Sequence, residues 1–302
     1  MNGLHIHLSD MGTGITFADQ GPSSETPAIT KITIESLIQA NGDTFADVGS
    51  VLKHHRKTIE DFCWAMDGEN DNRDIYDIQY PQLKKLTLNK SGWWIPRNAP
   101  LLEELTLSSR TINNHPAVLD TIPPSLKTLE LKLNEVPELV DTSSIKQYLL
   151  RFAQHSHLHE LVIISPTMDN IFNVVDAICH LKQLQRFAII ITMRPDSSQQ
   201  DRFLDQLARG CTNLSCLEIY CLYKGLSTHS INTLKQLGNL KQCSFAIDPT
   251  SDDGIWHALK TFPQLKCIRI YPAMPSHRMG IRRLKEKRPD MTVYLDQTFT
   301  RF

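Results

Sequence analysis

A short apolar phrase recurs along this chain, with leucine or another large apolar residue at its first, fourth and sixth positions. It occurs as Leu83-Lys-Lys-Leu86-Thr-Leu88 and again as Leu102-Glu-Glu-Leu105-Thr-Leu107. Self-similarity with a period of about 20–30 residues is typical of repeat proteins, so this phrase predicts the architecture. The same spacing returns at Leu126/Leu129/Leu131, Leu158/Leu161/Ile163, Leu184/Phe187/Ile189, Leu214/Leu217/Ile219, Leu240/Cys243/Phe245 and Leu265/Ile268/Ile270.

Looser copies extend the pattern toward both ends of the chain. Ile59/Phe62/Trp64 and Ile29/Ile32/Ile34 keep the spacing, Leu4 and Ile6 supply part of a further copy, and a looser strand is expected at 291–295. The fourth and sixth positions of a phrase lie two residues apart, so in an extended chain both point to one face. We therefore expect about 10 or 11 short strands, stacked in parallel because each buries its apolar face only against its neighbours.

Between the phrases, apolar residues recur every three to four positions, which predicts helices as crossover connections. Ser143 or Ser144 and Asp169 are expected N-caps, and Gly210 and Gly238 are expected to end helices. The unit from Leu83 to Leu102 is too short for a good helix, so we expect an extended or single-turn crossing there. The helical segments are expected near 45–52, 145–152, 171–178, 203–207, 231–237, 255–259 and 278–288.

Two kinds of local motif accompany the phrases. One segment reads Gly210-Cys211-Thr-Asn-Leu214-Ser-Cys-Leu217-Glu-Ile219, and an aromatic-Pro-Gln-Leu sequence leads into Leu83 and Leu265. With these features the chain resembles the leucine-rich repeat superfamily, in particular ribonuclease-inhibitor-like proteins and the repeat region of F-box/leucine-rich repeat proteins. The resemblance implies an α/β solenoid, a curved horseshoe with parallel strands on the concave face and helices on the convex face, as a single domain over residues 1–302.

The resemblance also carries expectations about function. It implies a non-enzymatic protein-binding module without cofactor, preferably the substrate-recognition part of an F-box-type ubiquitin-ligase receptor. A ribonuclease-inhibitor-like scaffold or inhibitor is the alternative. No F-box is visible, since no Leu-Pro opening occurs near the start and the chain opens inside a repeat. A ubiquitin-ligase adaptor is therefore expected as a partner only if an F-box is encoded upstream.

Composition and charge restrict the classes of partner and the cellular location that we expect. Of 302 residues, 41% are hydrophobic and 22% charged, and the formal net charge is −1, so nothing global favours nucleic acid or a membrane as partner. No signal peptide and no apolar run long enough to span a bilayer is found in the sequence. The seven cysteines are odd in number and several lie inside the phrases, which favours reduced thiols and a cytoplasmic or nuclear location.

The outward positions of the strands are the candidate partner site. The earlier strands offer polar residues such as Lys85, Glu104 and Glu130, whereas the later strands become apolar. A contiguous apolar patch commonly marks an interaction site, and the alternative is burial under the loop 220–227 or 271–277. The residues predicted to contact a protein partner on the concave face are Val162, Ile164, Arg186, Ala188, Ile190, Glu218, Tyr220, Ala246, Arg269 and Tyr271.

Three further clusters could carry chemistry. His5 and His7 alternate on one strand face, as in a metal-dependent hydrolase, which is an alternative from another class; otherwise they are half-exposed residues of an end strand. His155, His157 and His159 form a second cluster, for which a metal or a simple helix-end position are the two interpretations. The third cluster lies in the final helix and is either a solvated helix or a patch for phosphate or an acidic partner; it comprises Arg278, Arg282, Arg283, Lys285, Lys287 and Arg288.

Overall fold

The computed structural model describes residues 3–8, 29–39, 42–67, 75–134, 142–155, 157–192, 197–221, 225–247, 254–272 and 274–296. Contacts along the chain divide it into two compact units, Met1–Asp141 and Thr142–Phe302. The assignment of one domain to residues 1–302 stays a prediction. None of the helices within the described residues is both long and apolar enough to cross a membrane.

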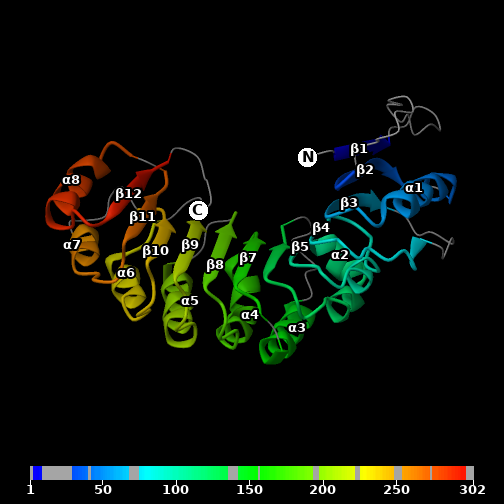
Figure 1. Cartoon of the computed structure of the whole chain (residues 1–302). Coiled ribbons are helices and arrows are strands. Elements are labelled where there is room, and N and C mark those ends of the chain that lie inside the picture. Colours follow the sequence, from blue (N-terminus) through cyan, green and yellow to red (C-terminus); the bar gives the residue numbers. More distant parts are fainter. Residues whose placement is uncertain are drawn as a thin grey trace. The chain divides into compact units, whose positions relative to one another are not determined.

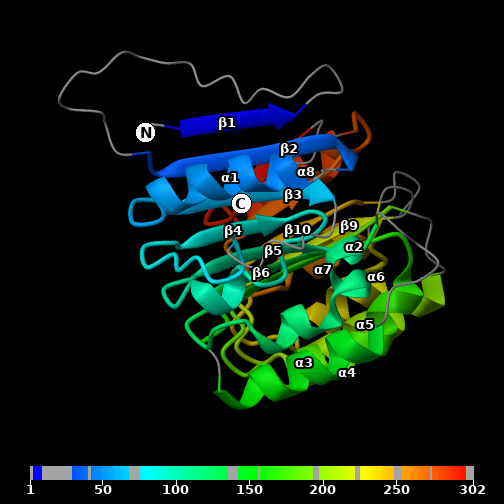
Figure 2. The same ribbon diagram turned by 90° about the vertical axis from the view of Figure 1, so that its right-hand side faces the viewer.

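The first unit is built on six parallel strands that pair in chain order. Figure 2 shows β1 to β4 lying one beside the next, with α1 along one face of them. Its elements are β1 (Gly3–Leu8), β2 (Lys31–Gln39), α1 (Gly42–His55), β3 (Asp61–Asp67), β4 (Lys85–Leu88), η2 (Pro96–Asn98), β5 (Glu104–Ser108), α2 (Ser109–Asn114), η3 (Pro116–Asp120) and β6 (Thr128–Lys132).

The second unit has the same arrangement of parallel strands, with an α-helix before each strand. Its strands again pair in parallel and in chain order, and Figure 1 shows α4 to α7 side by side along one face of them. Its elements are α3 (Thr142–His155), β7 (Glu160–Ser165), α4 (Met168–Cys179), β8 (Arg186–Ile191), α5 (Ser197–Gly210), β9 (Cys216–Cys221), α6 (Thr228–Leu234), β10 (Gln242–Phe245), α7 (Gly254–Lys260), β11 (Cys267–Ile270), α8 (His277–Lys287) and β12 (Thr292–Leu295).

The recurring phrase explains how the repeats stack. Leu86, Leu105 and Leu129 are register partners on neighbouring strands and are at most 1% exposed, so each phrase packs its leucines against those of the next. The backbone shows the same periodicity. The carbonyl of Glu60 accepts hydrogen bonds from the amides of Lys84 and Lys85 at 2.9 and 3.0 Å. The same pairing of one carbonyl with two successive amides of the next repeat recurs at Lys84, Glu103, His159, Gln185, Ser215 and Lys241. Apolar burial and shared backbone hydrogen bonds thus act at the same positions.

Most predicted elements are confirmed, including the single-turn crossing η2 in the short repeat. The described residues contain twelve strands, slightly more than expected, because the looser terminal copies also form strands. The N-cap predictions are wrong: Ser143 and Ser144 lie inside α3, and α4 begins after Thr167 rather than Asp169. Helix α6 ends at Leu234, before the expected Gly238.

Gly210 is the last residue of α5. A glycine is required at this position by close packing and not by a left-handed backbone conformation at the helix end. Among the described residues only Gly92 has a positive φ, of 91°. A Cβ on Gly210 would lie 2.3 Å from Cβ and 2.4 Å from Sγ of Cys179 on α4. The glycine therefore allows two neighbouring helices to approach closely.

Helix α8 is seated on α7 through a buried histidine. His277 is 3% exposed, its ring lies edge-on to Trp256 at 6.2 Å, and its Nδ1 accepts a 3.4 Å hydrogen bond from the amide of Met274. Burial lowers the pKa of His277 below its usual value near 6.5, although a backbone hydrogen bond with Ile247 opposes this shift. The folded state therefore favours the neutral ring.

Acidification is expected to destabilise the second unit through His277. Because its folded pKa is lowered, the unfolded chain binds the proton first as the pH falls through about 6.5, so the free energy of unfolding decreases. The full contribution is present above that pH and is lost below it. Thermal melts between about pH 7.5 and about pH 5.5 should show a smaller decrease in Tm for His277→Asn than for the unchanged protein. Equal decreases in both proteins would contradict this assignment.

Candidate functional site

The six strands of the second unit align their outward side chains in rows that run across the strands; we call this surface the strand face. The first row is Glu160, Arg186, Cys216, Gln242, Cys267 and Thr292, the second is Val162, Ala188, Glu218, Ser244, Arg269 and Tyr294, and the third begins with Ile164, Ile190 and Tyr220. These rows follow from parallel register, because partners on neighbouring strands point the same way.

The predicted contact residues divide by exposure. Half of them are partly exposed and half are buried, so the alternative of burial holds for half of the predicted set. Strand alternation determines to which side a side chain points, but not what packs over that side. The half-buried members, which a partner can reach directly, are Ile164, Arg186, Ile190, Arg269 and Tyr271. The buried members are Val162, Ala188, Glu218, Tyr220 and Ala246.

Arg186 on β8 links the strands on either side of it. Its Nε lies 3.6 Å from Oε2 of Glu160 on β7, and its Nη2 lies 3.6 Å from Oε1 of Glu218 on β9. The Glu218 side chain is only 3% exposed, so the arginine compensates a carboxylate that is otherwise costly to bury. Burial also raises the pKa of the adjacent Cys216 thiol to about 12, which keeps that thiol neutral.

Arg269 on β11 has a similar arrangement at the other end of the strand face. Its Nε lies 3.0 Å from Oδ2 of Asp296, and its guanidinium is placed 5.5 Å from the ring centre of Tyr294 on β12. An ion pair and a ring contact thus fix an arginine that is 13% exposed. Its orientation is set before any partner arrives, which reduces the entropy lost on binding.

Two of the predicted contact residues are tyrosines whose rings lie next to each other. The Tyr220 hydroxyl forms a hydrogen bond with Ser244 on β10, and its ring lies edge-on to Tyr271 at 6.0 Å. Burial raises the pKa of Tyr220, so its hydroxyl stays protonated. Tyr271 therefore covers part of Tyr220, which is the self-burial considered for the segment 271–277, while remaining partly accessible itself.

Several outward side chains on the strands of the first unit are charged rather than apolar. Lys31 on β2 pairs with Asp61 on β3 at 2.9 Å, and Lys85 on β4 pairs with Glu104 on β5 at 3.0 Å. The hydrogen bond to Glu104 raises the pKa of Lys85. Charges alternate from strand to strand and compensate one another, so this face has the character of a solvated surface.

The histidine clusters do not assemble a metal site in the described residues. His5 is exposed and lies 3.6 Å from a carboxylate oxygen of Glu35, whereas the side chains of His7 and His155 are outside the described residues. His157 is exposed and His159 is half-buried at the start of β7. No group of three or more His, Cys, Asp or Glu side chains that could hold a metal ion is found in the part of the chain that the structure describes.

All seven cysteines are free thiols, and five of them are buried. The burial of five cysteines confirms that these side chains are mostly buried, and their reduced state stays a prediction. Cys179 and Cys211 belong to adjacent repeats and lie 3.9 Å apart between their sulfurs. The sequence pattern does not indicate this pair, because the two residues are 32 positions apart and only stacking of the repeats brings them together.

Comparison with known proteins identifies the architecture. The chain is similar to a chain in the crystal structure of a TLR13–ssRNA13 complex, with a TM-score of 0.50 and 12% sequence identity. The fold is that of a leucine-rich repeat solenoid. The match covers 89% of this chain and 46% of the TLR13 chain, so this chain spans about half the length of that protein. No protein-family model matches the sequence, and no curated protein matches it.

Proposed function

We propose that this chain is a protein-binding module that uses the strand face of its second unit. The half-buried pair Ile164 and Ile190 carries the proposal, because these isoleucines are adjacent register partners on a strand surface, where alternation favours polar side chains. Two arginines with fixed orientation and a partly accessible tyrosine surround them. An apolar centre with a rim of arginine and tyrosine is the usual composition of a protein interface.

Two specific roles can be proposed for such a binding module. The resemblance to the repeat region of F-box proteins supports a substrate-recognition role in a ubiquitin-ligase receptor, and the resemblance to ribonuclease inhibitors supports a scaffold or inhibitor role. The two roles differ in what happens to the bound partner, which is degraded in one case and inhibited in the other. Raising the level of this chain should shorten the half-life of a ligase substrate, whereas an inhibitor should lower the activity of its target without changing its abundance.

Metal-dependent hydrolysis with His5 and His7 was the alternative from another class. The structure gives it no support, since no group of three or more metal-ligating side chains includes His5 within the described residues. A binding function also needs no convergent nucleophile, acid or base, and it uses the residues that the strand face presents. We therefore prefer the binding proposal over the hydrolase.

The double variant Ile164→Ser/Ile190→Ser is expected to retain about a tenth or less of the bound partner in affinity capture from the source cell extract. It removes the apolar centre of the strand face and leaves the covered residues in place. Quantitative mass spectrometry of the captured proteins measures the effect. Because both side chains are partly exposed, the far-UV circular dichroism spectrum should be unchanged.

Leu101→Ser is the matched control for this experiment. Leu101 is an aliphatic residue that is 50% exposed and belongs to the first unit, so its substitution is also an aliphatic-to-serine change but is not made on the strand face. We expect the control to retain the partner. The proposal is wrong if the strand-face variant captures the same proteins in the same amounts as the unchanged chain.

A further inference from the structure

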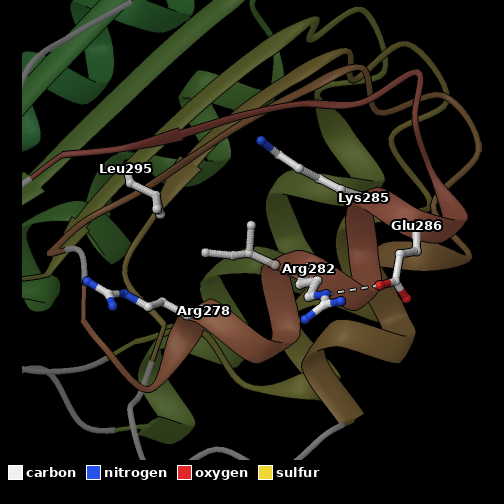
Figure 3. Close-up of a pocket in the computed structure, with 6 residues that line it drawn as sticks. Arg278, Arg282, Lys285, Glu286 and Leu295 are labelled. Carbon is white, nitrogen blue, oxygen red and sulfur yellow. Dashed lines mark hydrogen bonds and ion pairs between the residues drawn. The ribbon is translucent and has the colours of Figure 1, made fainter.

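A pocket lies between the last helix of the second unit, α8, and the last strand, β12. Its volume is about 560 Å³, and its walls are Arg278, Ile281, Arg282, Lys285, Glu286 and Leu295. Figure 3 shows Leu295 on the strand side of the pocket, with Arg278 and Lys285 extending from α8 at separate positions around it. None of these residues belongs to the strand face, so the pocket is a separate surface of the same unit.

The charge of α8 exceeds what its helix dipole explains. The helix carries five arginines and lysines but only one carboxylate, that of Glu286. Lys285 and Lys287 lie in the last turn, where cations are favoured. Arg278 lies in the first turn, where a cation is disfavoured by the same dipole. The interpretation of a simple solvated helix therefore leaves Arg278 unexplained.

Ion pairs and hydrogen bonds within the protein already engage some of the cations in and next to α8. Arg288, just beyond α8, donates to the carbonyls of Phe262 and Leu265 at 2.7 and 2.8 Å and pairs with Asp290, so it has a structural role. Arg282 pairs with Glu286 at 3.3 Å, as the dashed line in Figure 3 marks.

Within the part of the chain that the structure describes, the side chains of Arg278 and Lys285 pair with no carboxylate. They are the pocket's two uncompensated charges. Arg282, although it lines the same pocket, is neutralised by its neighbour one turn further along the helix.

Between these charges the surface is aliphatic. Leu295 on β12 is 46% exposed, and Ile281 from α8, which lines the same pocket, is 8% exposed. An exposed leucine next to a concave, largely apolar wall can accept another aliphatic side chain and release water from both. The pocket thus combines one apolar contact with two uncompensated positive charges.

We propose that this pocket docks an acidic peptide segment that inserts one large aliphatic side chain between Arg278 and Lys285. The aliphatic residue would pack on Leu295 and Ile281, and carboxylates on either side of it would pair with the two cations. Nucleic acid fits less well, because none of the described residues that line the pocket is aromatic and could stack on a base, and the Glu286 carboxylate repels phosphate. Charge complementarity and the aliphatic contact together select an acidic peptide.

The test measures binding of a fluorescent peptide with one leucine flanked by glutamates to the full chain, by fluorescence polarisation. We expect saturable binding that weakens as salt rises, and that falls about tenfold or more when the peptide leucine becomes serine. The double variant Arg278→Glu/Lys285→Glu should lose about tenfold in affinity as well. Leu295→Ser should lose affinity without changing the charge.

The matched control is Arg283→Glu/Lys287→Glu, which makes the same change of charge on the same helix but outside the pocket. It should keep most of the affinity, whereas a non-specific field effect would weaken both double variants equally and overturn the proposal. Tighter binding of a single-stranded oligonucleotide of equal charge, or no binding of the peptide, would also overturn it. The strand-face variant Ile164→Ser/Ile190→Ser should bind the peptide normally, so the two sites can fail independently.

Discussion

Replacing Trp64 with alanine is expected to lower the free energy of unfolding of the first unit by about 3–5 kcal/mol. Trp64 on β3 is fully buried, and its ring lies edge-on to Trp94 at 5.6 Å and to Phe62 at 5.9 Å. Its Nε1 donates a 3.0 Å hydrogen bond to Oγ of Ser91, which in turn donates to the carbonyl of Met66 at 2.7 Å. The substitution removes the largest fully buried side chain among the described residues and leaves a cavity at the centre of this network.

Urea unfolding followed by circular dichroism measures this loss, and hydrogen exchange locates it. Peptides from β2 to β4 should lose protection, while those from β9 to β11 should keep it, because solenoid repeats are stabilised mainly by their neighbours. Trp93→Ala is the matched control: Trp93 is only half-buried, so its loss should cost clearly less. An equal loss of stability in the two variants would show that Trp64 has no special packing role.

Replacing Gly280 with alanine is expected to destabilise the second unit by about 2 kcal/mol, although alanine is the better helix former. A Cβ at this position of α8 would lie 2.0–2.3 Å from ring atoms of Trp256. That ring is 7% exposed on α7 and is also in contact with His277. A rigid, buried indole cannot move aside as a flexible side chain would, so α8 itself must shift away from α7.

Gly49→Ala is the control, because it is expected to stabilise the protein rather than destabilise it. Gly49 lies inside α1, and a Cβ there would have no atom within 4 Å. Helix propensity alone then decides, and the variant should be more stable by about 0.5–1 kcal/mol. Thermal and urea unfolding of both variants checks the pair. If Gly280→Ala also stabilised the protein, the close packing of α7 against α8 would be refuted.

The strands and their order could be predicted from residues such as Leu86 and Leu88, because their spacing of two and the return of the phrase are local properties of the chain. The same is true of the rows on the strand face, since Ile164 and Ile190 occupy the same position in successive phrases. Helix ends were predicted less well. Thr167 and Asp169 are both good caps by residue type, and only the path of the chain after β7 decides which of them begins α4.

The candidate site was predicted only in outline for a related reason. Tyr220 and Ile190 look equivalent in the sequence, yet Tyr220 is buried and in ring contact with Tyr271, which lies 51 residues later, whereas Ile190 stays partly accessible. Arg288 seemed one more cation of the last helix, but carbonyls of the preceding repeat hold it. The availability of a side chain depends on partners that are distant in sequence, and periodicity carries no information about them.

For this protein, the sequence by itself determined the repeat and the direction in which each strand side chain points, because these depend on spacing and residue type. Only the tertiary structure decided which outward residues a partner can reach, which cations of α8 lack a carboxylate, and why Gly210 and Gly280 are glycines. Those properties arise where neighbouring repeats pack against each other at distances of a few ångströms. The spacing within one repeat cannot encode them.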